Sequence, residues 1–237
     1  MSQIADNLLL VKERVEKAAL KAGRDPGEIK LVAVSKTVGV EEIREAISAG
    51  ATILGESYVQ EAKEKIEEIC HQVGGRRIVP LLWHMIGHLQ TNKVKQAINL
   101  FDMIHSVDRI GLAEEINKRA KQSGKRVSVL IQVNISQETT KSGIERDRAI
   151  SLVLEVSNLT NLKVEGLMTM PPYFDDPDDA RPYFKSLREL KGEIGGERFE
   201  NISMKELSMG MSNDFEIAIE EGATIIRVGT AIFGERE

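Results

Sequence analysis

The feature that most constrains this chain is an alternation of short apolar, β-branched runs with helical patterns, repeated along nearly its whole length. In the first run, Leu31 and Ala33 form one apolar face, and Val32 and Val34 form the other. Strands that are apolar on both faces are typical of parallel sheets covered by helices. The candidate strands are residues 29–36, 51–57, 81–88, 103–108, 128–134, 162–170, 206–211 and 224–230.

Eight such units in 237 residues predict a single-domain α/β fold over residues 1–237, a closed (β/α)8 TIM barrel. An open doubly wound sheet is the alternative, although no Gly-x-Gly-x-x-Gly sequence follows the first run. Helical patterns include residues 109–122 and 145–159. An extra amphipathic helix precedes the first strand, with apolar residues three or four apart at Ile4, Leu8, Val11, Val15, Ala19 and Ala22.

Composition narrows the class of protein. Hydrophobic residues make up 41% and charged residues 29%, which suits a folded, soluble chain. The net charge of −5 gives no electrostatic reason to expect a nucleic-acid partner. Charged residues interrupt the first helix, and no segment has the roughly 18 apolar residues of a membrane span. With a single cysteine, Cys70, the sequence predicts a cytoplasmic protein without membrane or disulfide.

In a barrel of this kind, ligands bind where the strands end. Lys36 closes the first run and shares its face with Val32 and Val34, so we expect it to point into the barrel mouth, partly buried. Partial burial favours the free amine, which can attack an aldehyde to form a Schiff base. The alternative is a lysine that simply extends to solvent.

Two segments near the end of the chain suit a phosphate. Residues 208–212 (SMGMS) precede a helix expected to begin near Asn213, and residues 227–234 (RVGTAIFG) end the last strand. Small residues at the ends of strands seven and eight commonly bind phosphate in barrels. Ser212, Gly229 and Thr230 are the candidates, and ordinary helix capping by Ser212 is the alternative.

Arg227 shares a face with Ile225 and Gly229 and should also point inward. A buried arginine keeps its charge and needs an acceptor. That acceptor is either a ligand atom or a carboxylate such as Glu56, at the end of the second run.

The third run contains His84 and His88, four residues apart on one face of a strand. Paired histidines at this spacing suggest a metal on a helix, so we expect no metal here and a hydrogen-bonding role for His84. After the fifth run, Lys141 precedes Ser142 and Gly143 in a mouth loop. Lys141 either meets a phosphate or is a solvated loop lysine.

The whole chain resembles the pyridoxal phosphate homeostasis protein family. The motifs that carry the resemblance are 33–36 (AVSK), 55–61 (GESYVQE), 83–93 (WHMIGHLQTNK), 141–143 (KSG), 166–170 (GLMTM), 208–215 (SMGMSNDF) and 227–230 (RVGT). The third of these is the most specific. The resemblance implies a barrel similar to the N-terminal domain of alanine racemase, with pyridoxal 5'-phosphate bound covalently.

The resemblance also implies roles for single residues. Lys36 matches the lysine that forms the aldimine, and Arg227 matches the residue facing the pyridine nitrogen. Lys141 matches a lysine proposed to help release the cofactor. Ser57 departs from the family, which usually has asparagine there, so its contact with the cofactor is in doubt. The other matching positions are Met168 and Ser208 around the cofactor, and Ser212, Gly229 and Thr230 at the phosphate.

The family has no established reaction and is assigned to balancing pyridoxal phosphate pools, so we expect a non-catalytic carrier that delivers cofactor to apo enzymes. The first alternative is an amino-acid racemase. The chain ends at Glu237, soon after the eighth run, which would leave out the β-rich second domain of such enzymes. The second alternative is a class I aldolase, with Lys36 attacking a sugar phosphate. A monomer fits the absence of a second domain, and a dimer stays open.

Overall fold

The computed structural model describes residues 2–72, 81–136, 138, 142–195 and 199–235. Within them, eight parallel strands close into a barrel, because β4 pairs with β5 as well as with β3. The strands are β1 Lys30–Val34, β2 Ile53–Glu56, β3 Leu82–Met85, β4 Met103–Val107, β5 Val127–Asn134, β7 Leu162–Met168, β8 Ile202–Ser208 and β9 Ile225–Val228. A two-residue strand, β6 Ile144–Glu145, pairs with the end of β5. The predicted barrel is thus confirmed.

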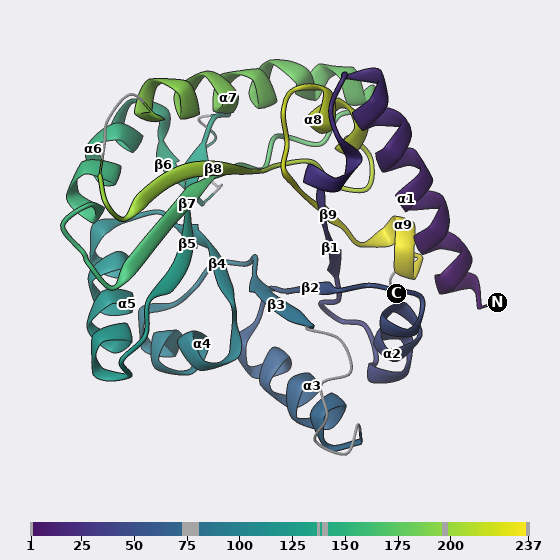
Figure 1. Cartoon of the computed structure of the whole chain (residues 1–237), viewed down its shortest axis with the longest axis horizontal. Helices are drawn as coiled ribbons and strands as arrows, with labels where there is room; N and C mark the ends of the chain where they lie inside the picture. Colours follow the sequence, from purple (N-terminus) through teal and green to yellow (C-terminus); the bar gives the residue numbers. More distant parts are fainter. Residues whose placement is uncertain (1, 73–80, 137, 139–141, 196–198, 236–237) are drawn as a thin grey trace.

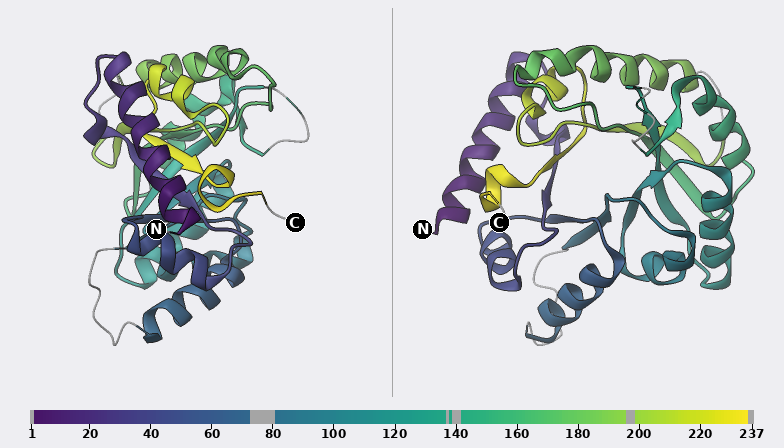
Figure 2. Two further views of the ribbon diagram at one scale, coloured as in Figure 1. Left: turned by 90° about the vertical axis from the view of Figure 1, so that its right-hand side faces the viewer. Right: turned by 180° about the vertical axis from the view of Figure 1, so that it is seen from behind.

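Helices surround the barrel (Figures 1 and 2). The helices that follow successive strands are α2 Val40–Ser48, α3 Val59–Gln72, α4 Val94–Leu100, α5 Ile110–Gln122, α6 Arg146–Val156, α7 Arg181–Gly195, α8 Phe215–Glu220 and α9 Thr230–Phe233. Short 3-10 turns lie at Pro26–Glu28, Thr91–Lys93 and Pro177–Ala180. No helix in the described ranges is both long enough and apolar enough to cross a membrane.

The expected N-terminal helix is α1, Gln3–Lys21, and its place in the barrel has a structural reason. The last helix, α9, has only four residues and ends at Gly234, whose φ is 86°. A helix this short leaves part of the β9–β1 seam uncovered. α1 packs against α8, α9 and α2, so it fills the position of a full eighth helix (Figure 1).

The strands differ from the predicted runs mainly at their ends. β8 begins at Ile202, four residues before the predicted start, where Lys205 and Glu206 hid the alternation. Its pairing with β7 shifts register, and Met204 has a φ of 44°. β1 ends at Val34 and β3 at Met85, so the site residues that follow lie on loops at the barrel mouth. Residues that follow the end of a strand are not fixed by ladder hydrogen bonds, so their side chains can face the site.

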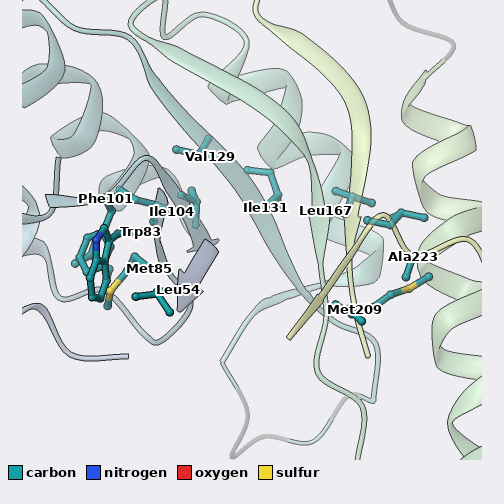
Figure 3. Packing of buried hydrophobic residues seen from close by; sticks show 14 of the residues in the cluster. Leu54, Trp83, Met85, Phe101, Ile104, Val129, Ile131, Leu167, Met209 and Ala223 are labelled. Carbon is teal, nitrogen blue, oxygen red and sulfur yellow. The ribbon is translucent and has the colours of Figure 1, made fainter. Parts of the chain in front are cut away.

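The main apolar core lies between the barrel and the helices. Figure 3 shows Leu54, Trp83 and Met85 close together, from the outward faces of β2 and β3. Burying a large apolar side chain of this kind contributes about 1.5–3 kcal/mol. A much smaller apolar cluster lies in the barrel interior, formed by Val32, Ile53, Leu130, Met168 and Ile225. Buried polar side chains, among them His84, His105 and Arg227, lie in the interior as well.

Candidate functional site

A cavity of about 300 Å³ opens at the carboxyl ends of the strands, near the lower end of the range usual for small-molecule sites. The structure brings six of the predicted residues to its wall, although they come from distant parts of the chain. They are Lys36, Ser57, Ser212, Arg227, Gly229 and Thr230. Because strands of a parallel barrel all end at one mouth, their following loops meet there.

Three other predicted residues lie deeper, away from the cavity wall. His84, Met168 and Ser208 are buried in the barrel interior. Lys141 falls outside the described residues. His88 follows the end of β3 instead of sharing its inner face, and its Nδ1 lies 3.9 Å from Asp108 Oδ2. The expectation that His84 and His88 lie on one face of the same strand is therefore wrong.

Lys36 lies on the rim of the cavity. It lines the wall as expected, but it is exposed, so the predicted partial burial is wrong. The reason is that β1 ends two residues earlier, which places Lys36 beyond the packed ladder. Lys36 therefore lines the cavity from a loop.

The two neighbours of Lys36 are held by polar contacts on the outer side of the barrel. Ser35 Oγ donates to Glu56 Oε1 at 2.7 Å, and the Thr37 amide donates to Glu61 Oε1 at 2.5 Å. Lys65, from α3, donates to Ser35 O at 2.5 Å, to Glu56 at 2.9 Å and to Glu61 at 2.6 Å. We call Ser35, Glu56, Glu61 and Lys65 the outer cluster. It fixes the backbone on both sides of Lys36.

Glu56 is fully buried in the outer cluster. Burial raises the pKa of its carboxyl, and hydrogen bonds from Ser35 and Lys65 partly oppose that rise. Glu56 therefore pairs with Lys65, and the suggested ion pair with Arg227 is wrong. The two side chains lie on opposite sides of the barrel wall, since Glu56 faces α3 and Arg227 faces the interior.

Arg227 is 3% exposed and borders the cavity. Its Nη1 donates to Ser208 Oγ at 2.6 Å and its Nη2 to Thr169 O at 2.9 Å. No carboxylate among the described residues hydrogen-bonds to it. Burial lowers the pKa of Arg227 to about 10, and the charge of Asp214 partly opposes that shift. A nearly buried cation thus rests on neutral acceptors, which is unusual.

Hydrogen bonds connect Ser208 to two buried histidines, first His105 and then His84. His105 Nδ1 lies 3.0 Å from Ser208 Oγ, and His105 Nε2 lies 3.0 Å from His84 Nδ1. We call Arg227, Ser208, His105 and His84 the interior chain. Burial is the main cause that lowers the pKa of His84 to about 4 and holds the pKa of His105 well below its ordinary value. Sequence reasoning missed His105, although alternation along β4 from Met103 would have turned it inward.

The loops after β8 and β9 are joined at the cavity by Ser212. Its Oγ accepts from the Gly229 amide at 3.2 Å and from the Ala231 amide at 3.3 Å. Ser212 therefore caps the start of α9 across a loop. This contact places the Ser212 hydroxyl beside Gly229 and Thr230 at one end of the cavity.

The long loop after β7 forms an apolar wall that the sequence did not predict as part of the site. Pro172, Tyr173, Phe174 and Pro177 line the cavity. Asn213 Nδ2 donates to Phe174 O at 3.0 Å, which ties this loop to the β8–α8 loop. Tyr173 is 77% exposed, so the wall also reaches the surface.

Comparison with known proteins agrees with this geometry. Residues 2–237 match the family model described as alanine racemase, N-terminal domain. A pyridoxal phosphate homeostasis protein of Aquifex aeolicus is 47% identical over 232 residues, covering 98% of each chain. One from Pseudomonas aeruginosa is 40% identical, covering 100% of this chain and 97% of the relative.

Solved structures are also similar to this chain over nearly its whole length. PipY of Synechococcus elongatus PCC7942, solved with PLP bound, is 32% identical with a TM-score of 0.83, covering 98% of this chain and 100% of PipY. An alanine racemase of Clostridium difficile 630 shares the fold, with a TM-score of 0.71 at 18% identity, covering 98% of this chain and 60% of the racemase. The chain belongs to the pyridoxal phosphate homeostasis protein family, built on the fold of the alanine racemase N-terminal domain.

Proposed function

We propose that this chain is a pyridoxal 5'-phosphate-binding protein of one barrel domain, with Lys36 as the point of covalent attachment. The observation that carries the proposal is the single cavity whose wall contains Lys36, Arg227 and Ser212. PipY, the relative solved with PLP, adds support.

The residues at the cavity fit the cofactor chemically. Pyridoxal phosphate supplies an aldehyde that a lysine amine can attack, beside an aromatic ring with a basic nitrogen and a dianionic phosphate. Lys36 provides the amine, and Arg227 provides a donor for the ring nitrogen. Val34 and Ile86 line the same cavity with apolar surface suited to the ring faces. Ser57, shorter than the usual asparagine, lies beside them.

The phosphate is the main non-covalent anchor in this proposal. Ser212 and Thr230 can direct hydroxyl donors to one end of the cavity, beside the Gly229 amide, which donates to Ser212 Oγ in this structure. Each hydrogen bond to a charged phosphate oxygen contributes about 1.5–3 kcal/mol. Unphosphorylated pyridoxal should therefore bind far more weakly, and equal affinities would contradict this site.

The function that fits this pocket best is holding and releasing the cofactor in the cytoplasm, with apo pyridoxal-dependent enzymes as recipients. Enzymes that use the ring as an electron sink place an acidic partner at the ring nitrogen. Arg227 can only donate there, which leaves the nitrogen unprotonated and the ring a weaker electron sink. Lys141 remains a candidate for the release step.

An amino-acid racemase is the second candidate. Racemisation needs two groups that can move a proton at the substrate. Tyr173 lines the cavity together with Lys36, so the wall holds a second side chain of that kind. Its high exposure argues against a fixed position in the reaction.

Reduction and mapping test the proposal. The loaded protein should be yellow, and borohydride followed by peptide mapping should place a pyridoxyl group on Lys36. A label found solely on another lysine would overturn the assignment. Incubation with L-alanine in deuterated water then separates the two candidates. Exchange of the α-hydrogen at about 1 per second or faster, lost in Lys36→Ala, would establish the racemase.

A further inference from the structure

The interior chain has a direction that its first member imposes. An arginine carries donors and no acceptor, so Arg227 Nη1 must donate to Ser208 Oγ. Ser208 has one hydroxyl hydrogen, and the acceptor within reach is His105 Nδ1 at 3.0 Å. If His105 donated instead, the buried hydroxyl hydrogen would have no acceptor among the described contacts, which is costly.

The same logic continues to the second histidine. With Nδ1 accepting, a neutral His105 carries its hydrogen on Nε2 and donates it to His84 Nδ1 at 3.0 Å. His84 then also carries its hydrogen on Nε2. Both rings are buried, and a charged His105 could not accept from Ser208. Burial, with Arg227 nearby, lowers the pKa of His105, in agreement with a neutral ring.

We propose that Ser208 and His105 are positioning residues that hold Arg227 by a one-way relay of hydrogen bonds, Arg227 to Ser208 to His105 to His84, and so keep its guanidinium aimed at the cavity. The proposal rests on the proposed binding of pyridoxal phosphate. Each dipole in the relay turns its negative end toward Arg227, which stabilises the buried cation without a direct hydrogen bond to a carboxylate and adds to the more distant charge of Asp214. The cation thus stays available to an acceptor atom in the cavity.

The relay therefore selects for ligands that present a ring acceptor. Arg227 has five N–H hydrogens, and the contacts to Ser208 and Thr169 use two of them. A pyridine nitrogen with a lone pair can accept from the group. An N-methylated pyridine has no lone pair and carries a positive charge, so it should be rejected.

Nitrogen-15 NMR of histidine-labelled protein tests the relay without any cofactor. The chain has four histidines, so substitution of each one assigns the signals, and the exposed His88 serves as a reference. At pH 7, His84 and His105 should both be neutral and protonated on Nε2. Protonation of His105 on Nδ1, or a charged ring at either position, would overturn the direction of the relay.

Ligand discrimination tests the positioning role. The unmodified protein should bind pyridoxal phosphate at least about tenfold more tightly than its N-methylated analogue, a difference of about 1.4 kcal/mol. His105→Leu and Ser208→Ala should reduce that ratio severalfold, whereas His105→Asn, whose carbonyl can replace Nδ1, should restore it. The matched control is Met103→Leu, on the inner face of the same strand, and should keep the ratio.

The outcomes separate the two proposals. An unchanged ratio in both His105→Leu and Ser208→Ala would overturn the positioning role. If His105→Leu fails to fold, Ser208→Ala and the NMR experiment still decide. Failure of the unmodified protein to bind pyridoxal phosphate would contradict both the proposed function and the positioning role. The NMR experiment would still test the direction of the relay.

Discussion

The outer cluster and the interior chain lie on opposite sides of the barrel wall, and each contains a buried cation with different partners. In the outer cluster, Lys65 contacts two carboxylates, those of Glu56 and Glu61. In the interior chain, Arg227 contacts a hydroxyl and a backbone carbonyl. A carboxylate beside Arg227 would occupy its donors and cancel its charge. The comparison suggests that the outer group stabilises the fold, whereas the interior group keeps a charge for a ligand.

The largest effect is expected from breaking the outer cluster. Lys65→Met leaves the buried Glu56 without its cation, and breaking a buried pair costs about 3–5 kcal/mol of unfolding free energy. Urea denaturation at pH 7 measures it. Lys63→Met, on the same helix but at an exposed pair, should change stability by about 0.5 kcal/mol or less.

The pH dependence of the Lys65→Met variant sharpens this prediction. Removal of Lys65 should raise the pKa of Glu56 further above its unfolded value of 4.5, because Lys65 lowers it now. A carboxyl with a raised folded-state pKa favours the folded state at low pH and loses that stability as the pH rises through it. The difference in the free energy of unfolding between the variant and the unmodified protein should therefore be smaller in mild acid than at pH 8. The opposite trend would contradict the assignment of Glu56.

The second effect is acid sensitivity of the interior chain. Burial lowers the pKa of His84 from 6.5 to about 4, so its neutral form is favoured in the folded state. That stability is present above pH 6.5 and is lost as the pH falls toward 4, by about 3 kcal/mol. Urea midpoints measured across this range should fall less steeply in His84→Gln than in the unmodified protein. His88→Gln, at an exposed site, should keep the steep dependence.

The smallest stability effect is expected at Arg227. Arg227→Met leaves two neutral acceptors without a partner and removes no hydrogen bond from a carboxylate, which costs about 1–3 kcal/mol. Affinity for pyridoxal phosphate should nevertheless fall at least about tenfold. Fluorescence titration and urea denaturation measure the two quantities. A stability loss larger than that of Lys65→Met would erase the contrast between the two groups.

Much of the site followed from the pattern of the chain. Parallel strands place their carboxyl ends at one mouth, so Lys36, Ser212 and Arg227 could be expected to meet there. The exposure of Lys36 could not be predicted, because strand ends depend on where the ladder with neighbouring strands stops. The apolar wall at Phe174 was also missed, since a loop has no periodicity that predicts its direction.

The sequence by itself determined the barrel, its extra first helix and the mouth as the place of the site, because periodicity and chain order decide which faces are buried and which ends meet. Only the tertiary structure decided which inward side chains touch. Ser208 and His105 are 103 residues apart and meet through the closure and stagger of the barrel. Alternation predicts the face of a strand on which a side chain lies. It does not predict how far along the barrel axis that side chain lies relative to a side chain on the opposite strand. That relative position decides whether two inward side chains such as Ser208 and His105 are within hydrogen-bond distance.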